Sequence, residues 1–597
     1  MKKIAGCLAL STIVIITFTQ CNDFLEVKSE STFNTKVIFS DLDLATKTVL
    51  GLYANLALSD FYEYVVGFFY SCDSDIEHTY GNDDSGGRAI ARYKANGGNS
   101  YLSGPWRLMY QTIERANICI DNLPNSPLWT GDESKEAKRL YGEALTIRAL
   151  CYFELVRNWG DVPFPAKSFQ DGDPYVLPKT NRDLIYERMI ADLLVAEEYV
   201  PWMKETKTVE RVSKGFVKGL RARMALAYAG FSYRNAGEIA GRGRYWEEYY
   251  GIARTECKEI MDSREHRLYP NYRDFFKKLH AYQMDLEYGE SLFEIAFGRS
   301  YSGQVGYTLG MSFLTSPSHP TYGWAMASFA TNPYYFFSFH TNDTVRRSVS
   351  CELYNYSNKD YPGRQNLIGI NGWRLCKWRK NWIQPNMGGN LRDVKYTGIN
   401  WPLMRYADIV LMYAEAENQL GSTPSQEAKD ALASVRKRAF APATWPATVE
   451  HYIDSVSVDK QTFFQAVVNE RAWEFGGEMI RKYDLIRWNL LGEKLNLVKT
   501  ESRKIADYNT NTNNYPEWRH VPGYLYYRYL SDGETLEILN PDRNLGYTTV
   551  SGYSRTTWIS TKSDKSTLYK LLDDIGNGYD PAKNNHLLPI SATIIDE

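Results

Sequence analysis

Apolar side chains recur at steps of three and four residues along much of this 597-residue sequence, and this period constrains its fold more than any other feature. The spacing is that of one face of an α-helix. The first such face is formed by Trp106, Tyr110, Ile113, Asn117 and Ile120. Two prolines interrupt it before a second face runs through 134–158, so the two stretches predict a helical hairpin with Trp106, Tyr110 and Asn117 in its core.

Similar pairs of helical stretches recur further along the chain. They lie at 182–199 with 213–231, at 403–420 with 425–440, and at 461–475 with 479–491. Each pair of amphipathic helices can bury its apolar face against the next pair, so repeated pairs indicate a helical superhelix. The spacing between pairs is irregular. The sequence therefore predicts a mostly α fold, with a scaffold of helix pairs over about 40–260 and 400–495 and long irregular loop insertions.

The insertions are expected at about 262–400 and 500–597, where helical periods are scarce and Gly, Pro, Asn and aromatic residues are frequent. Aromatic residues make up 14% of the chain, which contains 45 Tyr and 15 Trp. Compact domains seldom hold so much irregular chain unless it performs a task such as binding. We therefore expect the insertions to form the working surface and the helices to support it.

The N-terminus has the layout of a secretory signal peptide over residues 1–20. Two lysines precede an apolar run at 8–18, which is shorter than the ~20 residues that a membrane-spanning helix requires. Cys21 follows this segment and is the expected lipidation site. Cys7 ends a better lipobox, but no apolar run precedes it. The alternative is a soluble secreted protein cut nearby, in which Cys21 is a spare thiol.

The bulk composition argues against several classes of protein. Removing the signal changes the formal net charge from −2 to about −4, which argues against nucleic acid as a partner and against a polybasic membrane patch. The sequence lacks GxSxG, HExxH, GxxxxGK and GxGxxG motifs, and we expect no cofactor.

The remaining cysteines contain no CxxC pair, which weakens a zinc or thioredoxin-type interpretation. They are Cys72, Cys119, Cys151, Cys257, Cys351 and Cys376. Cys119 and Cys151 lie in apolar helical patterns and are expected to be free, buried thiols. A disulfide pairing cannot be read from the sequence.

Several long segments form a recognisable series: CNDFLEV (21–27), WRLMYQTIERANICIDNLP (106–124), EALTIRALCYFELVRNWGDVPF (143–164), LMRYADIVLMYAEAENQLG (403–421) and ERAWEFGGEMIRKYDLIRW (470–488). In order and spacing they resemble the SusD/RagB family of nutrient-uptake lipoproteins. The shorter runs YERMIADLLVAEEYVP, DTVRR and HLLPIS agree. The resemblance covers essentially the whole mature chain, 21–597, as one SusD-like domain.

The resemblance implies an outward-facing outer-membrane lipoprotein, lipid-anchored through Cys21. Its fold would be a right-handed superhelix of tetratricopeptide-like helix pairs with long loops. It would capture an oligosaccharide or similar nutrient as a lid on a SusC-like TonB-dependent transporter, without catalysing a reaction. Two features depart from the family. The lipobox before Cys21 is weak, and the chain stops at Glu597, whereas family members commonly continue to an Asn-Pro-Gly-Tyr tail.

A sugar site needs exposed aromatic platforms with hydrogen-bonding groups at their edges, because a sugar ring has apolar C–H faces and polar margins. Two stretches offer this mixture, 70–105 and 315–340. Family loops do not align residue by residue, so the candidates rest on residue type: Tyr80, Arg88, Tyr101, Tyr322 and Trp324. A second candidate group is Trp373, Trp378 and Trp382. For each residue the alternative is a side chain that packs its loop onto the scaffold.

Paired carboxylates would also suit a glycoside hydrolase, which is the alternative function. The acids concerned lie at helical spacing near three arginines: Glu470, Glu474 and Glu478 with Arg471, Arg481 and Arg487. Acids and arginines so placed usually neutralise each other, so we expect them to clamp the helix pair. Arg148 and Arg157 are likewise expected to meet carboxylates, and Trp488 to be a core residue.

An acidic run at Asp73, Asp75, Glu77 and Asp84 only partly resembles a calcium-binding loop. His78 occupies the position where such a loop needs glycine, and Asp84 the position where glutamate is typical. A solvated acidic loop is therefore favoured, and no metal is expected. A third function, adhesin or structural surface protein, predicts no small-ligand affinity. The sequence identifies neither the sugar nor its linkage, and it leaves glycan and peptide cargo open.

Overall fold

The computed structural model of the chain describes residues 35–595 apart from 235–239, 315–317, 357, 359, 386–394, 511–512, 559–561 and 584. The predicted signal peptide at 1–20, the lipidation site Cys21 and the terminal Glu597 therefore lie outside the described residues. In the described part, no helix combines the length and apolar character needed to cross a membrane.

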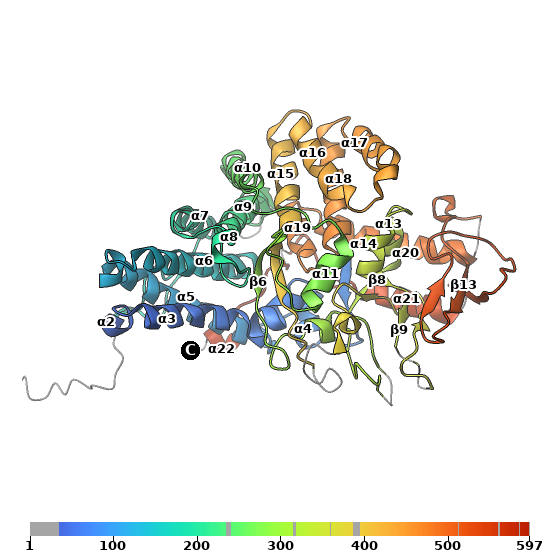
Figure 1. Ribbon diagram of the computed structural model, residues 1–597, viewed down its shortest axis with the longest axis horizontal. Helices are drawn as coiled ribbons and strands as arrows, with labels where there is room; N and C mark the ends of the chain where they lie inside the picture. The colour runs from blue at the N-terminus through green and yellow to red at the C-terminus, as the bar shows by residue number, and fades with distance from the viewer. Residues whose placement is uncertain are drawn as a thin grey trace, which may run out of the picture.

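A series of long helices forms an arc along the molecule (Figure 1). They are α3 (Leu42–Leu56), α5 (Ser103–Asn122), α6 (Ser134–Trp159), α7 (Arg182–Tyr199), α9 (Lys214–Ala229), α10 (Trp246–Ser263), α15 (Tyr406–Leu420), α16 (Gln426–Lys437) and α18 (Lys460–Phe475). Successive members pack in order, α5 on α6, α6 on α7, α7 on α9, α9 on α10 and α10 on α15. This arrangement confirms the predicted mostly α superhelix of helix pairs.

Local sequence sets the ends of these helices. Side chains of Asp41, Asn181, Ser425 and Asp459 cap α3, α7, α16 and α18 by accepting hydrogen bonds from backbone N–H groups of the first turn. At the other end of α6, Gly160 takes a φ of +74°, which glycine adopts without a Cβ clash. The hairpin core is as predicted, with Trp106 and Asn117 buried and the Tyr110 hydroxyl donating to the Pro163 carbonyl over 2.7 Å.

The insertion between α10 and α15 contains more regular structure than the sequence indicates. A four-stranded sheet has the order β1 (Glu77–Thr79), β7 (Phe329–Thr331), β11 (Arg374–Leu375) and β8 (Cys351–Glu352), and β6 (Ser291–Ile295) pairs with β12 (Trp401–Arg405). The helices here are α11 (Tyr272–His280), α12 (Val305–Thr308), α13 (Pro333–Ser338) and α14 (Thr344–Ser350). The helix predicted to begin at 403 begins at Tyr406, because residues 401–405 pair as a strand.

The C-terminal insertion also differs from the predicted irregular loop. Its helices are α20 (Leu491–Thr510) and α21 (Lys562–Asp574), and its sheet consists of β13 (Tyr524–Tyr529), β14 (Leu536–Ile538) and β15 (Ser554–Thr557). The helix predicted over 479–491 is shorter: α19 spans Arg481–Arg487, because Met479 and Asn489 adopt positive φ on either side of it.

Short elements complete the described fold. The helices are α2 (Thr35–Ile38), α4 (Gly86–Ala91), α8 (Met203–Thr206), α17 (His451–Val456) and α22 (Ala592–Ile595). The strand pairs are β2 (Val162–Pro163) with β3 (Lys179–Thr180), β4 (Phe231–Ser232) with β5 (Gly241–Arg242), and β9 (Tyr354–Asn355) with β10 (Asn366–Leu367). Near the C-terminus, Leu588 N donates to the Asn158 carbonyl over 2.7 Å, so the HLLPIS segment closes against α6.

All six cysteines of the described chain are buried free thiols, which confirms the prediction for Cys119 and Cys151 and answers the open question of pairing. Burial raises the pKa of the Cys119 thiol to about 12, so it is inert at neutral pH.

Candidate functional site

The two loops predicted to bind ligand are brought side by side by strand pairing. Strand β1 pairs antiparallel with β7, and the hydrogen bonding continues past the strands, since Tyr80 N donates to the Ser328 carbonyl over 2.9 Å. The strands are antiparallel, so the C-terminal end of β1 lies beside the N-terminal end of β7. The loop that follows β1 from residue 80 is therefore next to the loop that precedes β7. Candidate residues about 240 positions apart in sequence therefore lie on neighbouring loops.

Tyr80 is a partly exposed ring supported by an arginine. It is 39% exposed, and the guanidinium carbon of Arg374 lies 3.7 Å from its ring centre. Arg374 is itself fixed, since its Nε donates to the Ala327 carbonyl over 3.0 Å. A cation packed on one face orients the ring. Arg374 was missed by sequence reasoning because nothing in the two-residue strand β11 distinguishes it locally.

Trp324 is the more exposed aromatic of the second loop. It is 44% exposed, and Met326 beside it is 46% exposed. The backbone here is tightly held: Lys380 Nζ donates to the Trp324 carbonyl over 3.1 Å, and Gly323 adopts a φ of +61°. Tyr80 and Trp324 thus retain accessible ring surface on adjoining loops, as a stacking platform requires.

Tyr322 and Tyr101 are more enclosed. Tyr322 packs on a small buried cluster with Phe313 and donates its hydroxyl hydrogen bond to the Asn381 carbonyl over 3.3 Å. Tyr101 lies edge-on to Phe69 and directly under Gly86, where a Cβ would meet the ring at 2.8 Å. Both side chains therefore help to hold their loops on the scaffold.

Arg88 lies on α4, at the margin of the first loop. Its Nε donates to the Asp83 carbonyl over 3.1 Å, and its guanidinium forms an ion pair with the Asp83 carboxylate. Its side chain is 30% exposed and that of Asp83 55%, so this pair offers both donors and acceptors to solvent. Of the five candidates, Tyr80, Arg88 and Trp324 combine exposure with ligand-binding chemistry.

The second candidate group is wrong for two of its three members. Trp373 and Trp378 have no exposed surface; Trp373 packs on Phe336, and Trp378 Nε1 donates to the Gly477 carbonyl over 2.8 Å. Loop position does not ensure exposure, because these loops fold over a core of their own. Trp382 is half-buried and lines a groove of about 550 Å³ beside α11, whose other lining residues include Tyr269, Asp274, Lys277, Lys278, Asn381 and Gln384.

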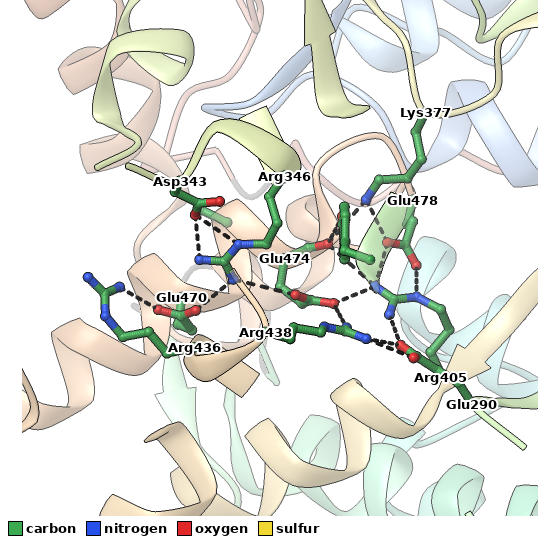
Figure 2. Close-up of polar contacts among 12 residues, drawn as sticks. Glu290, Asp343, Arg346, Lys377, Arg405, Arg436, Arg438, Glu470, Glu474 and Glu478 are labelled. Carbon is green, nitrogen blue, oxygen red and sulfur yellow. Dashed lines mark hydrogen bonds and ion pairs between the residues drawn. The ribbon is translucent and has the colours of Figure 1, made fainter. Parts of the chain in front are cut away.

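The predicted carboxylate clamp exists, but with other partners (Figure 2). Its ion pairs are Glu470 with Arg346 (2.7 Å) and Arg436 (3.0 Å), Glu474 with Arg405 (3.0 Å) and Arg438, and Glu478 with Arg405 (2.7 Å) and Lys377 (2.7 Å). Glu290 joins the cluster through Arg405 and Arg438. Burial acts to raise the pKa of Glu474, but Arg438 and Arg405 outweigh it and lower that pKa to about 2.

The arginines expected beside these acids bind elsewhere. Arg471 pairs with Asp408 (2.6 Å) and Asp484 (2.7 Å), Arg481 with Asp75 (2.8 Å), and Arg487 with Glu415. Helical spacing predicted neutralisation correctly but not the partners, which come from distant segments. Arg148 pairs with Asp192 and Arg157 with Glu154, both over 2.6 Å, as expected, and Trp488 is buried. Carboxylates buried in ion pairs of this kind are closed to a sugar substrate, so these acids do not form the accessible carboxylate pair that glycoside hydrolysis requires.

The acidic run is occupied by structural contacts. Asp75 is held by Arg481, Asp84 pairs with Arg92 (2.8 Å) and Lys94 (2.7 Å), and Asp73 accepts from Thr79 N (2.8 Å) and Gly576 N (2.9 Å). Within the described ranges, no group of three or more His, Cys, Asp or Glu side chains is placed to hold a metal ion. The solvated loop expected from sequence is wrong for Asp73, Asp75 and Glu77, which are buried.

Fold and surface together define a helical-repeat protein whose insertions carry exposed aromatic rings on a rigid scaffold. Family comparison agrees: a model described as "SusD family" matches residues 227–530, and one described as "Starch-binding associating with outer membrane" matches residues 23–226. The chain belongs to the SusD/RagB family, as the sequence resemblance indicated.

Similar proteins cover most of the chain. SusD-like protein P25 of Formosa agariphila is 25% identical over 541 residues, 84% of this chain and 93% of the relative. A SusD homolog of Bacteroides thetaiotaomicron superposes with a TM-score of 0.69 at 23% identity, over 78% of this chain and 90% of that one. Surface glycan-binding protein A of the same organism, solved with laminarihexaose, gives 0.57 at 18% identity over 75% and 90%. These structures share the fold.

Proposed function

We propose that this protein is a surface-exposed outer-membrane lipoprotein that binds a glycan and delivers it to a SusC-like TonB-dependent transporter, without catalysing a reaction. The observation that carries the proposal is the exposure of two aromatic rings, Tyr80 and Trp324, on loops that the β1–β7 pairing brings together, and we propose that these rings form a stacking platform. Both rings are partly exposed, both loops are fixed by hydrogen bonds, and the Arg88–Asp83 pair supplies polar groups at the margin. This combination matches the faces and edges of a sugar ring.

Binding on such a platform would consist of ring stacking with hydrogen bonds at the edges of the sugar, and no covalent step. Each sugar hydroxyl that leaves water must regain its hydrogen bonds, so stacking supplies most of the gain and the affinity per sugar is modest. A rigid platform reduces the cost of ordering side chains, and the Arg374 contact fixes the Tyr80 ring before ligand arrives. Asn381 lines the groove beside Trp382 and its carbonyl accepts a hydrogen bond from Tyr322, so the groove adjoins the second candidate loop and is the proposed extension of the site for a longer glycan.

Anchoring through Cys21 and docking on a transporter form the second part of the proposal. They rest on the signal-like N-terminus, on family membership and on the outer-membrane association in the family description. Mass spectrometry of the native protein should find a lipid on Cys21, and an unlipidated N-terminus beyond that residue would contradict the anchor. Copurification with a large β-barrel from the outer membrane tests the partner.

Calorimetry with purified protein tests glycan binding. Laminarin oligosaccharides come first, because one solved relative is described as a laminarin-binding SusD-like protein. Trp324→Ala and Tyr80→Ala should each weaken binding about 2- to 12-fold, since a lost stacking contact costs about 0.5 to 1.5 kcal/mol. Tyr361→Ala is the matched control, because Tyr361 is a 60% exposed ring in another loop. Equal effects of the control and the platform variants would refute the platform.

The hydrolase alternative is tested in the same samples. Prolonged incubation with each bound glycan should release no shorter product, because Glu470, Glu474 and Glu478 are committed to ion pairs (Figure 2). Product release would overturn the assignment as a binding protein. Absence of affinity for any glycan or peptide would instead favour an adhesin or structural role.

A further inference from the structure

A cavity of about 60 Å³ lies inside the helical scaffold, away from the glycan platform. Its walls come from α6, α7, α9, β4, α15, α18 and α19, and from His586 near the C-terminus. A cavity of this size has room for a few water molecules or for one small anion. Side chains of α6, from the first helix pair, and of α18 and α19, from the last, line this cavity together although the helices lie far apart in sequence.

Arginines dominate the polar part of this cavity, and all but one are matched by acids. Those with partners are Arg157 with Glu154, Arg223 with Asp408, Arg471 with Asp408 and Asp484, and Arg487 with Asp484 and Glu415. Glu154 pairs with Arg157, and the remaining three arginines share three acids, Asp408, Asp484 and Glu415. These ion pairs therefore balance in charge.

Arg182 is the exception. It is 5% exposed, lines the cavity, and forms no ion pair with a carboxylate among the described residues. Its backbone N–H is fixed by the Asp161 carboxylate over 2.9 Å, at the start of α7, but its Nε has no hydrogen-bond partner there. A buried guanidinium without a counter-ion is costly, so the site is incomplete as the protein chain alone forms it.

Two uncharged groups, the Tyr186 hydroxyl and the His586 imidazole, line the cavity beside Arg182. The Tyr186 hydroxyl also lines the cavity close to the Arg182 side chain, whose guanidinium carbon lies 5.8 Å from the Tyr186 ring centre. Burial, followed by the charges of Arg182 and Lys482, lowers the pKa of His586 to about 3, so His586 is neutral at pH 7 and Arg182 supplies the positive charge. An anion placed beside Arg182 would receive a charged donor and a hydroxyl donor.

We propose that this cavity binds a small carboxylate, with Arg182 as its charge partner and Tyr186 as a second hydrogen-bond donor. A planar guanidinium matches the two oxygens of a carboxylate. The remaining walls favour a short apolar body over a fully hydrated ion, because they include Phe153, Leu226, Phe231 and Met412. Binding would link the two ends of the scaffold through one buried ion.

Titration calorimetry and thermal denaturation of the full mature protein test the proposal, with sodium acetate exchanged for sodium chloride at constant ionic strength. Acetate should bind and raise the denaturation midpoint. Arg182→Gln should weaken acetate binding at least tenfold, and Tyr186→Phe about fivefold, the loss typical of one hydrogen bond. Arg188→Gln should leave binding unchanged: Arg188 lies on the same helix, its side chain is 57% exposed, and its partner Asp192 keeps Arg148.

Several results would overturn the proposal. These are no acetate binding by the unaltered protein, equal binding by the Arg182→Gln protein, or phosphate binding more tightly than acetate. Tyr186→Phe keeps the test decisive if Arg182→Gln does not fold, because it removes one oxygen and leaves the charge in place. Unchanged acetate affinity in the Tyr186→Phe protein would then count against the site.

Discussion

The Arg374 guanidinium lies 3.7 Å from the centre of the Tyr80 ring, and this contact joins the two halves of the proposed glycan platform. Tyr80 directly follows β1, whereas Arg374 belongs to β11. Arg374 also donates a hydrogen bond to the Ala327 carbonyl, on the loop that contains Trp324. One buried arginine therefore positions a ring from the first loop and the backbone of the second. We therefore expect Arg374 to affect glycan binding through these two contacts, without contacting the ligand itself.

Arg374→Ala is expected to weaken glycan binding about 3- to 30-fold, because a cation on an aromatic face contributes about 0.5 to 2 kcal/mol to holding it. Calorimetry on the same glycan as for Trp324→Ala checks this. Arg364→Ala is the matched control, since its guanidinium lies 3.4 Å from the Tyr529 ring in a different part of the chain. An affinity loss in the control as large as in Arg374→Ala would exclude a specific positioning role.

Gly86→Ala is expected to destabilise the protein by about 1 to 3 kcal/mol and to weaken glycan binding. Gly86 has a φ of +51°, and a Cβ there would lie 2.8 Å from the Tyr101 ring, so backbone strain and a clash act together. Urea denaturation measures the first effect. Gly172→Ala separates the two causes, because Gly172 has a φ of +96° with open space around its Cβ position. Equal losses in both variants would leave strain alone as the cause.

The helix pairs were predictable because their signal is local. The period of Trp106, Tyr110 and Ile113 and the caps at Asn181 and Asp459 lie within one or two turns of the helices they define. The sheet of β1, β7, β11 and β8 could not be predicted from the sequence. Its strands of two or three residues are too short to show an alternation of apolar and polar side chains, and β1 and β7 lie about 250 residues apart.

The candidate site shows the same limit at the level of single residues. Trp324 and Trp373 have similar loop surroundings in sequence, yet one is 44% exposed and the other is completely buried. Tertiary packing against Phe336 and Trp558 makes the difference, and no local pattern reports it. Arg374, which contacts both the Tyr80 ring and the Ala327 carbonyl, has no local sequence signal.

Glu77→Gln is expected to stabilise the protein at pH 8 relative to the unaltered chain and to have little effect at pH 4.5. Glu77 lies on β1, both carboxylate oxygens lack hydrogen-bond partners, and burial followed by the charge of Asp75 raises its pKa to about 8. An unfolded glutamate ionises near pH 4.3, so between the two pKa values folding must keep Glu77 protonated, and stability falls as pH rises. Urea denaturation across this range measures the difference.

The control is Glu493→Gln on α20, where the side chain is 63% exposed. The stability gap between Glu77→Gln and the unaltered protein should widen steadily from pH 4.5 to 8, while the control should show no such trend. A constant gap at all pH values would mean that Glu77 does not change its charge in this window.

Arg405→Met is expected to cost about 3 to 5 kcal/mol at pH 7, because it leaves buried charges on Glu290, Glu474 and Glu478 without their shared partner (Figure 2). The pKa of Glu474 is lowered to about 2 because Arg438 and Arg405 outweigh the burial that would raise it. The ionised Glu474 carboxylate therefore contributes its full stabilisation above the pKa of an unfolded glutamate, and this contribution is lost as pH falls toward 2. The difference in free energy of unfolding between Arg405→Met and the unaltered protein should accordingly be smaller at pH 3 than at pH 7. Arg254→Met, which removes a pair with Glu417 at 3.6 Å and a 45% exposed arginine, should change stability little at either pH. If Arg405→Met behaved like this surface control, the network would be a by-product of packing and not a clamp.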